Sequence, residues 1–510
     1  MKKMWITMVL CGYLAMNLTA CQSTPEEAAV VDKSEGLPPE SILEVDNENP
    51  KELGISEHWK ETLERQEGYI TLEVDCETDL GEIYNTPVYE YEMESLSNEK
   101  LKWLCAYFAD GCRLYKEPPM TKSQLEQEKE DMMEQTNFWR SEVYEKMDEL
   151  IETAPEAINY EYVDVEFTVP YQTEREIIKS EEGNASSMFS EFYFETDEKI
   201  GFKARVDKNQ ELNPSIQVIS YNKEVGSTSN FVYKQGTFVD ELWLRKQFDN
   251  HKVLDFGEDG VKDLERLKEQ LQDDGIEKDK DNFSEEDALE MIYEILKDLS
   301  LEGYAVIDCY KAIGTPDYEG MAELYKDDLI LIPAYSVYLS YQAGSLMGYE
   351  NPFQRPFDGL PEQTYAPSFS TEEIHIVVTE EGVQLFEWTN ISKKTKEIAN
   401  NTKLMIFGEI KEKFADHLLY KSIAALGEDS KSQGDLVKFN VKNVELRTVN
   451  VPAFENADAV WLVPAWVFTV QETWITEAMG ELYMGEEVVV LNAIDGGYVR
   501  PRIDYRIPVR

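Results

Sequence analysis

Residues able to carry out acid–base chemistry are few, and their spacing matches no known catalytic arrangement. The four histidines are far apart in the chain: His58, His251, His375 and His417. None belongs to an H-E-x-x-H zinc motif, and His375 lies in the alternating run Ile374–Val377, which is typical of a strand face. No G-x-S-x-G elbow, P-loop or dinucleotide-binding glycine pattern occurs. The sequence therefore predicts no catalytic residue and no cofactor.

Three weaker patterns have simpler explanations. Ser97 and Lys100 have the S-x-x-K spacing of penicillin-recognising nucleophiles, but neither S-D-N nor K-T-G follows, and Ser97 is better explained as a helix N-cap. A calcium loop starting at Asp255 would place Arg266 where a glutamate is needed, and one starting at Asp279 lacks ligands in its middle. We therefore expect no metal site. Paired carboxylates for glycoside hydrolysis stay an open alternative, because their separation in space identifies them and the chain has 101 acidic residues.

The balance of charge excludes several classes of partner. The 510 residues include 101 acidic and 49 basic side chains, a formal net charge of −52. Nucleic-acid binding needs clustered Lys and Arg to displace phosphate counterions, so we expect no nucleic-acid partner. A polybasic attachment to anionic lipids is excluded for the same reason. The 42% content of hydrophobic residues is enough to form folded cores.

The N-terminus has the pattern of a bacterial lipoprotein signal. Lys2 and Lys3 precede a short apolar run, Met4–Leu18, and the lipobox Leu18–Cys21 closes it. We expect residues 1–20 to be removed and the thiol of Cys21 to receive a diacylglyceryl group, so that the lipid anchors the protein in the membrane. The alternative is an ordinary secretory signal with a coincidental cysteine. The predicted location is the extracytoplasmic side of the cell membrane.

The acidic segment 21–58 is expected to be a disordered tether. Residues 22–48 contain eight acidic side chains, one lysine and little apolar periodicity. At about 3.3 Å per residue, such a segment reaches at most roughly 90 Å from the bilayer. Removal of the signal leaves 47 basic residues against 101 acidic ones, so the mature chain carries −54.

Four cysteines remain after the signal: Cys76, Cys105, Cys112 and Cys309. They allow three disulfide pairings, among which the sequence cannot choose. Cys105 lies in the apolar run Leu101–Phe108, where a buried thiol is at least as plausible as a disulfide. No C-x-x-C spacing indicates zinc.

The rest of the chain is predicted to be multi-domain α+β, with small antiparallel sheets packed against helices. The first unit is expected over 59–275, and two further units over 276–392 and 393–510. Each of these two has the order helix, strand, strand, loop, strand, which indicates an internal duplication. The second strand carries a shared motif, and its six defining residues are Pro333, Ala334, Tyr335, Pro464, Ala465 and Trp466. Because proline cannot donate to a ladder, both prolines are expected at an edge, a strand start or a bulge.

A long loop in the first of these repeats, 343–370, is the candidate partner-binding surface. It is rich in proline and contains five aromatic residues of interest: Tyr349, Phe353, Phe357, Tyr365 and Phe369. Loops of this length are usually functional or disordered. One interpretation is an exposed platform for a peptide, glycan or protein. The other is that the rings pack back on their own domain.

Two resemblances follow from these motifs. The lipobox, the start Gln22–Glu26 and the end Ala493–Gly496 resemble uncharacterised lipoproteins of clostridial-type Gram-positive bacteria. That resemblance implies a location and no catalytic residues. The helix-plus-strands units, with Val463–Trp466 and Asn492–Gly496, are similar to PepSY-like and YycH-type extracytoplasmic modules, and this similarity implies a regulatory or inhibitory role.

The expected function is that of a non-enzymatic, membrane-anchored binding or regulatory lipoprotein. Its partner would be an envelope protein or a peptide that docks on the repeat pair or on the aromatic loop. Two alternatives are an extracytoplasmic hydrolase that uses acidic residues and a structural protein of the cell envelope.

Overall fold

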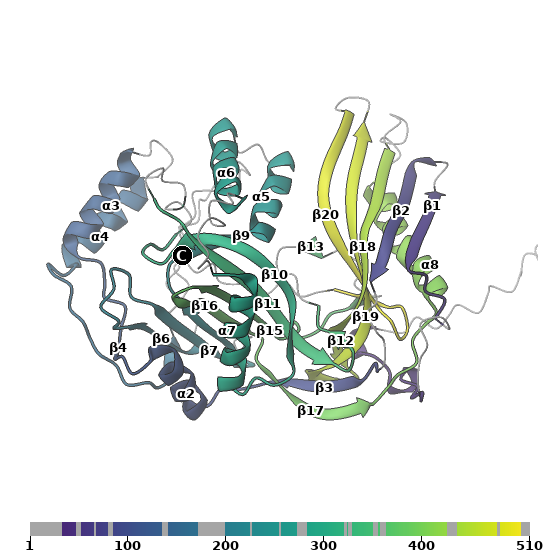
Figure 1. Cartoon of the computed structure of the whole chain (residues 1–510), viewed down its shortest axis with the longest axis horizontal. Helices are drawn as coiled ribbons and strands as arrows, with labels where there is room; N and C mark the ends of the chain where they lie inside the picture. The colour runs from purple at the N-terminus through teal and green to yellow at the C-terminus, as the bar shows by residue number, and fades with distance from the viewer. Residues whose placement is uncertain are drawn as a thin grey trace, which may run out of the picture.

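The computed structural model describes most of the chain between Lys33 and Arg500. The described residues are 33–46, 53–65, 68–79, 85–134, 141–171, 199–224, 227–253, 257–272, 283–320, 324, 329–349, 355–356, 364–425, 436–476 and 480–500. Cys21 and the expected signal lie outside them. The fold is multi-domain α+β, as predicted, but the strands form two large and mostly antiparallel sheets side by side rather than small ones (Figure 1). Among the described residues, no helix is both long and apolar enough to cross a membrane.

The first sheet has ten strands and combines the two ends of the described chain. Its strands are β1 (His58–Arg65), β2 (Ile70–Asp79), β3 (Val88–Met93), β13 (Arg355–Pro356), β14 (Thr364–Tyr365), β17 (Ser392–Ala399), β18 (Leu436–Ala453), β19 (Asn456–Thr476), β20 (Gly480–Asn492) and β21 (Tyr498–Val499). Helix α8 (Phe407–Ala425) packs on it, and Phe407, Phe414 and Trp466 are buried in that core. We call this part the 10-stranded lobe.

The second sheet has eleven strands, all from the middle of the chain. They are β4 (Leu114–Tyr115), β5 (Thr168–Tyr171), β6 (Lys199–Val206), β7 (Ser215–Ser220), β8 (Asn230–Lys234), β9 (Thr237–Asp240), β10 (Tyr304–Thr315), β11 (Ile332–Ala343), β12 (Leu346–Met347), β15 (Glu373–Thr379) and β16 (Gly382–Thr389). The helices of this 11-stranded lobe are α2 (Asn98–Ala109), α3 (Lys122–Glu134), α4 (Ser141–Thr153), α5 (Glu241–Val253), α6 (Gly257–Gln272) and α7 (Glu285–Asp298).

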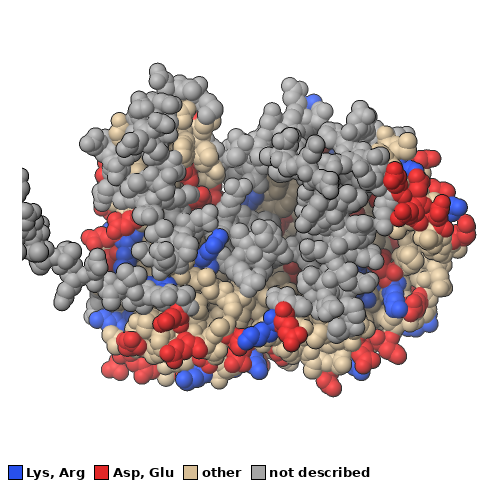
Figure 2. All heavy atoms as spheres, turned by 180° about the vertical axis from the view of Figure 1, so that it is seen from behind, with Lys and Arg blue, Asp and Glu red and all other residues tan. Residues whose placement is uncertain are grey.

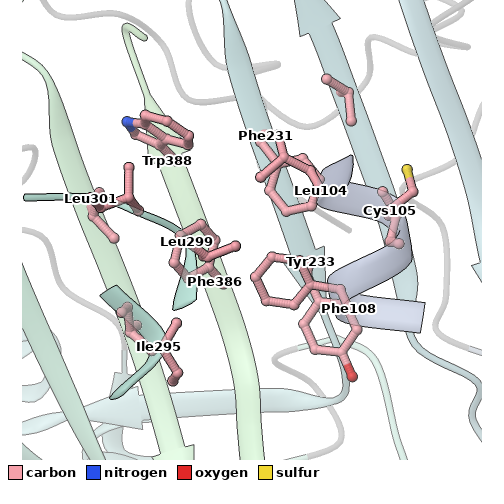
Figure 3. Packing of buried hydrophobic residues seen from close by; sticks show 14 of the residues in the cluster. Leu104, Cys105, Phe108, Phe231, Tyr233, Ile295, Leu299, Leu301, Phe386 and Trp388 are labelled. Atoms are coloured by element: carbon pink, nitrogen blue, oxygen red, sulfur yellow. The ribbon is translucent and has the colours of Figure 1, made fainter. Parts of the chain in front are cut away.

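Helices α2 and α7 cover one face of the 11-stranded sheet. The ring of Phe108 on α2 lies 4.9–5.1 Å from the rings of Phe231, Tyr233 and Phe386 (Figure 3). Both helices begin where local chemistry favours it. The Ser97 side chain accepts from the N–H of Lys100, which confirms the expected N-cap. Ser284 and Asp287 form a reciprocal capping box at the start of α7.

The strand pairing does not follow the expected domain boundaries. The unit expected over 59–275 is divided, because β1–β3 pair in the 10-stranded sheet and β4–β9 in the 11-stranded sheet. Parallel pairing of β2 with β18 joins residues more than 360 positions apart, such as Leu72 and Phe439. The chain leaves the 10-stranded lobe after β3, contributes the two short strands β13 and β14 to it, and returns at β17, where Met93 pairs with Ser392. Sequence periodicity identifies a strand but not so distant a partner.

A buried carboxylate lies where the chain crosses between the lobes. Glu372 Oε1 accepts hydrogen bonds from the Tyr304 hydroxyl and from Trp388 Nε1, the latter at 2.6 Å. Its Oε2 accepts from the backbone N–H of Ser392 at 3.1 Å and from the Ser392 hydroxyl at 2.8 Å. Four donors from β10, β16 and β17 therefore surround one carboxylate at this crossing.

The two expected repeats have the same topology. In each, a helix precedes three strands, and the motif strand lies between the other two: α7–β10–β11–β15 and α8–β18–β19–β20. In each, pairing with the third strand begins just after the motif proline, at Tyr335↔Val378 and at Ala465↔Asn492. The two copies therefore share a helix and three paired strands, and in the first copy the short strands β12, β13 and β14 lie between the motif strand and the third strand.

The two motif prolines lie in different places within their strands. Pro333 is the second residue of β11, as expected. Pro464 lies in the interior of β19, at neither its start nor a bulge. On one side, the neighbour of β19 changes there from β3, which ends its pairing at Leu462, to β20, which begins at Ala465. A residue without an N–H fits this gap between two ladders.

Part of the expected tether is ordered. Residues 33–46 form the short turns η1 (Lys33–Glu35) and η2 (Pro39–Ser41) and lie against the 10-stranded lobe. Leu37 is completely buried in a core with Val451 and Ala453. Burial of this leucine and the backbone hydrogen bonds of residues 37 and 45 to the lobe both act against the ordering entropy of the segment. The expectation of disorder over 21–58 is therefore wrong for residues 33–46, and also for residues 53–58, where Leu53 is buried and its carbonyl accepts from the N–H of Phe407.

Candidate functional site

A row of polar side chains lies on the face of the 11-stranded sheet that α2 and α7 leave free. Along β11, Val337 and Leu339 point into the helix-covered core, so Ser336 and Tyr338 point to the opposite face. Pairing of β11 with β15 places His375 directly beside Tyr338. The sheet itself thus brings together residues from separate strands.

Five side chains form the central cluster of this face, which we call the Ser336 network: Asp240, Ser336, Tyr338, His375 and Glu387. Ser336 Oγ lies 2.6 Å from Asp240 Oδ2 and 2.8 Å from His375 Nε2. The Tyr338 hydroxyl donates to the same Asp240 oxygen at 3.2 Å. His375 Nδ1 lies 3.9 Å from Glu387 Oε2. Asp240 Oδ1 also accepts from a backbone N–H at the start of α5, so the carboxylate is held from both sides.

The geometry assigns the protons within the network. A serine hydroxyl has one proton, and an ionised carboxylate at 2.6 Å is a stronger acceptor than an imidazole nitrogen at 2.8 Å. Ser336 therefore donates to Asp240, and His375 donates from Nε2–H to Ser336 Oγ. In this arrangement the imidazole is not a base toward the serine. Ser336 is also 1% exposed.

Aromatic rings extend the network across three strands. The Tyr338 and His375 rings stack with centroids 4.2 Å apart and an interplanar angle of 3°. The ring of Tyr310 on β10 meets Tyr338 edge-on at 6.1 Å. Burial and the charge of Asp308 raise the pKa of Tyr310 to about 12. The rings hold the imidazole in one orientation.

The polar face lies toward the 10-stranded lobe at its β10 end. Desolvation raises the pKa of Asp308, while the nearby charge of Arg447 on β18 acts in the opposite direction. The ion pair between Lys246 on α5 and Glu486 on β20, 3.0 Å long, links the lobes directly. Charged groups of both lobes therefore meet beside the Ser336 network.

An ion-pair cluster continues the row on the other side. Arg205 on β6 makes two bonds to Glu319, at 2.8 and 3.1 Å, and also pairs with Glu117. Burial lowers the pKa of Lys234 on β8, whereas the charges of Glu319 and Glu387 act to raise it. Glu387 is thus shared between this cluster and His375.

In the described parts of the aromatic loop, residues 343–349, 355–356 and 364–370, the aromatic rings do not form the exposed platform that was one of its two interpretations. Tyr365 is completely buried, Phe369 is 3% exposed, and Tyr349 is half-buried against the core of the 10-stranded lobe. Phe353 and Phe357 lie outside the described residues. Tyr349 and Tyr365 pack on the 10-stranded lobe rather than on their own domain, so the other interpretation is also only partly met.

The described parts of the loop connect the lobes. Tyr365 pairs with Val499 in β21, and the backbone N–H of Tyr349 donates to the Thr448 carbonyl at 2.8 Å. The Phe369 carbonyl accepts from Asn450 Nδ2 at 3.3 Å. The loop leaves the 11-stranded lobe after β12, contacts the 10-stranded lobe and returns at β15. The backbone groups of Tyr349, Tyr365 and Phe369 bond to the 10-stranded lobe, and their rings lie in or against its cores.

The repeat motifs are structural. Ala334 and Ala465 are buried, and Trp466 lies under α8 with its ring 4.6 Å from that of Phe407. Tyr335 packs against the core below α7. Tyr335 and Trp466 thus lie on the helix-covered faces, whereas Ala334 and Ala465 lie in cores on the opposite faces of their sheets.

The four cysteines named above are free thiols. Burial raises the pKa of Cys105 to about 12 and that of Cys309 to about 11. Within the described part of the chain, no group of three or more His, Cys, Asp and Glu side chains could hold a metal ion.

Sequence reasoning placed His375 on a strand face but missed its partners. Glu387, Ser336 and Asp240 lie 12, 39 and 135 residues from it and belong to no motif. The one available signal is the run Ser336–Ser340, in which polar residues alternate with apolar ones. That pattern predicts a sheet face lined by hydroxyl groups.

Comparison with known proteins assigns no family. No protein family matches the chain, and no curated protein matches it. Among solved structures, an uncharacterized protein from Eubacterium rectale is similar over 90% of this chain and 100% of that chain, with 10% sequence identity and a TM-score of 0.41.

Proposed function

We propose that the protein is a non-enzymatic binding or regulatory lipoprotein, anchored to the extracytoplasmic side of the cell membrane through Cys21. Its partner is an envelope protein or a peptide, which contacts the polar face of the 11-stranded sheet beside the 10-stranded lobe. The lipobox supports the location. The repeated helix-plus-three-strands topology supports the similarity to PepSY-like modules.

The observation that carries the proposal is the proton arrangement of the Ser336 network. A nucleophilic serine must give its proton to a base as it attacks, and it must be reachable by the substrate. Ser336 is buried and gives its proton to Asp240. What this face offers to a partner is charge and aromatic surface, namely the exposed Asp308 and the half-buried Tyr310.

A serine hydrolase is the second candidate, because Ser336 contacts His375 and His375 in turn lies near Glu387, as the serine, histidine and acid of a catalytic triad do. Hydrolysis would require Asp240 to release the serine hydroxyl and Glu387 to approach His375 more closely. A fluorophosphonate probe separates the two candidates. We expect no labelling of the purified protein, and labelling that disappears in Ser336→Ala would establish the hydrolase instead.

In-cell photocrosslinking tests the binding function directly. Benzoylphenylalanine replaces either Tyr310, on the polar face, or Tyr293, which is 53% exposed on α7. Both changes replace a tyrosine with another aromatic residue, so Tyr293 is the matched control. We expect a crosslinked protein or peptide at Tyr310 only. Equal crosslinking at both positions, or none at Tyr310, would contradict a partner site on this face.

A further inference from the structure

We infer that residues 33–46 are a docked leash that holds the end of the 10-stranded lobe around Lys33 and the β18–β19 turn next to the lipid surface. This inference rests on the proposed lipid anchor at Cys21. It concerns which surface of the protein faces the membrane.

The leash begins at a polar contact with the body. Lys33 Nζ forms an ion pair with Asp495, and their side chains are 16% and 18% exposed. Lys33 also donates to the Tyr365 hydroxyl at 3.1 Å, and that hydroxyl donates to Asp495 Oδ2 at 2.7 Å. A partly buried pair of this kind is screened less than an exposed one, so the contact fixes this end of the leash.

The middle of the leash is held by burial and by close backbone packing. Leu37 is completely buried, and its N–H donates to the Pro452 carbonyl. Gly36 has φ +94°, and a Cβ at this position would lie 2.6 Å from the Pro452 carbonyl oxygen. The chain can approach the β18–β19 turn this closely only because residue 36 has no side chain.

The far part of the leash pairs with the segment before α8. The N–H of Val45 donates to the Asn401 carbonyl at 3.1 Å, and the N–H of Lys403 donates to the Leu43 carbonyl at 2.8 Å. Asn401 Nδ2 donates to the Val45 carbonyl at 3.2 Å. The leash is therefore held at three places: at Lys33 by the ion pair with Asp495, at Leu37 by burial, and at residues 43–45 by backbone pairing.

Docking shortens the reach of the anchor. Eleven residues lie between Cys21 and Lys33. Fully extended, they span about 40 Å, whereas an undocked chain from Cys21 to Leu53 would span about 110 Å. The point where the leash meets the body must therefore lie within about 40 Å of the lipid surface. Helices α3 and α4 lie at the opposite end of the molecule (Figure 1).

Energy transfer to headgroup acceptors in vesicles tests this orientation. The lipidated full-length protein carries a dye on an azide-bearing residue in place of Glu455, in the β18–β19 turn, or of Glu130, on α3. Both positions are exposed glutamates, so the charge change is the same. We expect several-fold more transfer from position 455. Equal transfer from both positions, or more from 130, would overturn the inference.

Release of the leash is the second arm. Lys33→Glu places two like charges together, and Leu37→Asp puts a charge into the core that holds residue 37, so the double variant should release this part of the leash and lower transfer from position 455 several-fold. Lys60→Glu is the control, because Lys60 makes an exposed pair with Asp75 in the same lobe. Unchanged transfer in the Lys33→Glu, Leu37→Asp variant overturns the docked leash. Protein that carries no lipid and does not bind vesicles overturns the proposed anchor as well.

Discussion

Ser336 makes two hydrogen bonds within the network, and each has a separate consequence. The Ser336 hydroxyl donates to the Asp240 carboxylate, which also accepts from a backbone N–H in the first turn of α5. Its bond from His375 satisfies the imidazole, whose ring is fixed between Tyr338 and Glu387. A buried polar group that loses its partner costs more than the bond itself contributes.

We therefore expect Ser336→Ala to lower the free energy of unfolding by about 1–3 kcal/mol. The substitution leaves Asp240 with one side-chain donor, the Tyr338 hydroxyl, and removes the Ser336 oxygen that accepts from His375 Nε2–H. Urea denaturation followed by far-ultraviolet circular dichroism measures the change. Ser215→Ala is the control, because the Ser215 hydroxyl makes one long bond of 3.5 Å. Equal stability of the two variants would contradict the network.

Glu372 is the second residue with a prediction of its own. Its pKa is raised by burial, against four hydrogen bonds that act to lower it. A carboxylate with a raised folded-state pKa stabilises the protein below its unfolded pKa, and this contribution is lost as the pH rises through the folded-state pKa.

The stability of the natural protein relative to Glu372→Gln should therefore fall as the pH rises from about 4 toward neutrality. Subtraction of the two urea-denaturation curves at each pH removes the titration of the other carboxylates. A relative stability that rises with pH would show that the hydrogen bonds from Tyr304, Trp388 and Ser392 outweigh burial.

At the scale of elements, β17 is protected as an edge strand. It pairs only with β3, and its residues from Lys393 to Glu397 are exposed. Two register shifts interrupt this pairing. Exposed lysines and bulges are the usual means of preventing edge-to-edge association. The three lysines of this strand are a local exception in a chain of net charge −52, whose acidic side chains are spread over the described back surface (Figure 2).

Replacement of Lys393, Lys394 and Lys396 by threonine should promote association through β17. Size-exclusion chromatography with light scattering measures it. The control replaces the exposed lysines Lys102, Lys116 and Lys403 by threonine, which changes the net charge equally. Association of both triple variants would show that the change in net charge, and not the exposed edge of β17, causes it.

At the scale of the whole molecule, one lobe is inserted into the other. Every strand of the 11-stranded sheet comes from residues between β3 and β17. The 10-stranded sheet is completed only when the chain returns, because β2 and β3 need β18 and β19 as partners. The stability of β2 and β3 therefore depends on β18 and β19, which lie near the C-terminal end of the described chain.

A fragment of residues 94–392 should fold alone, whereas a fragment of residues 59–275 should not. The first contains all eleven strands of its sheet, together with α2 and α7. The second contains β1–β3 without β17, β18 or β19. Circular dichroism and resistance to limited proteolysis check both fragments. A folded 59–275 fragment would contradict the interleaved arrangement.

The sequence by itself determined the local features of this protein. Serine caps, apolar alternation and the repeated motif depend on residues close together in the chain, and they predicted the α+β class, the start of α2 and the helix–strand order around Pro333 and Pro464. Tertiary structure alone decided the rest. The docking of Leu37, the burial of Tyr365 and the meeting of Asp240, Ser336 and His375 depend on pairings between distant strands. Periodicity gives a strand its buried face, but only the packed molecule selects its neighbours.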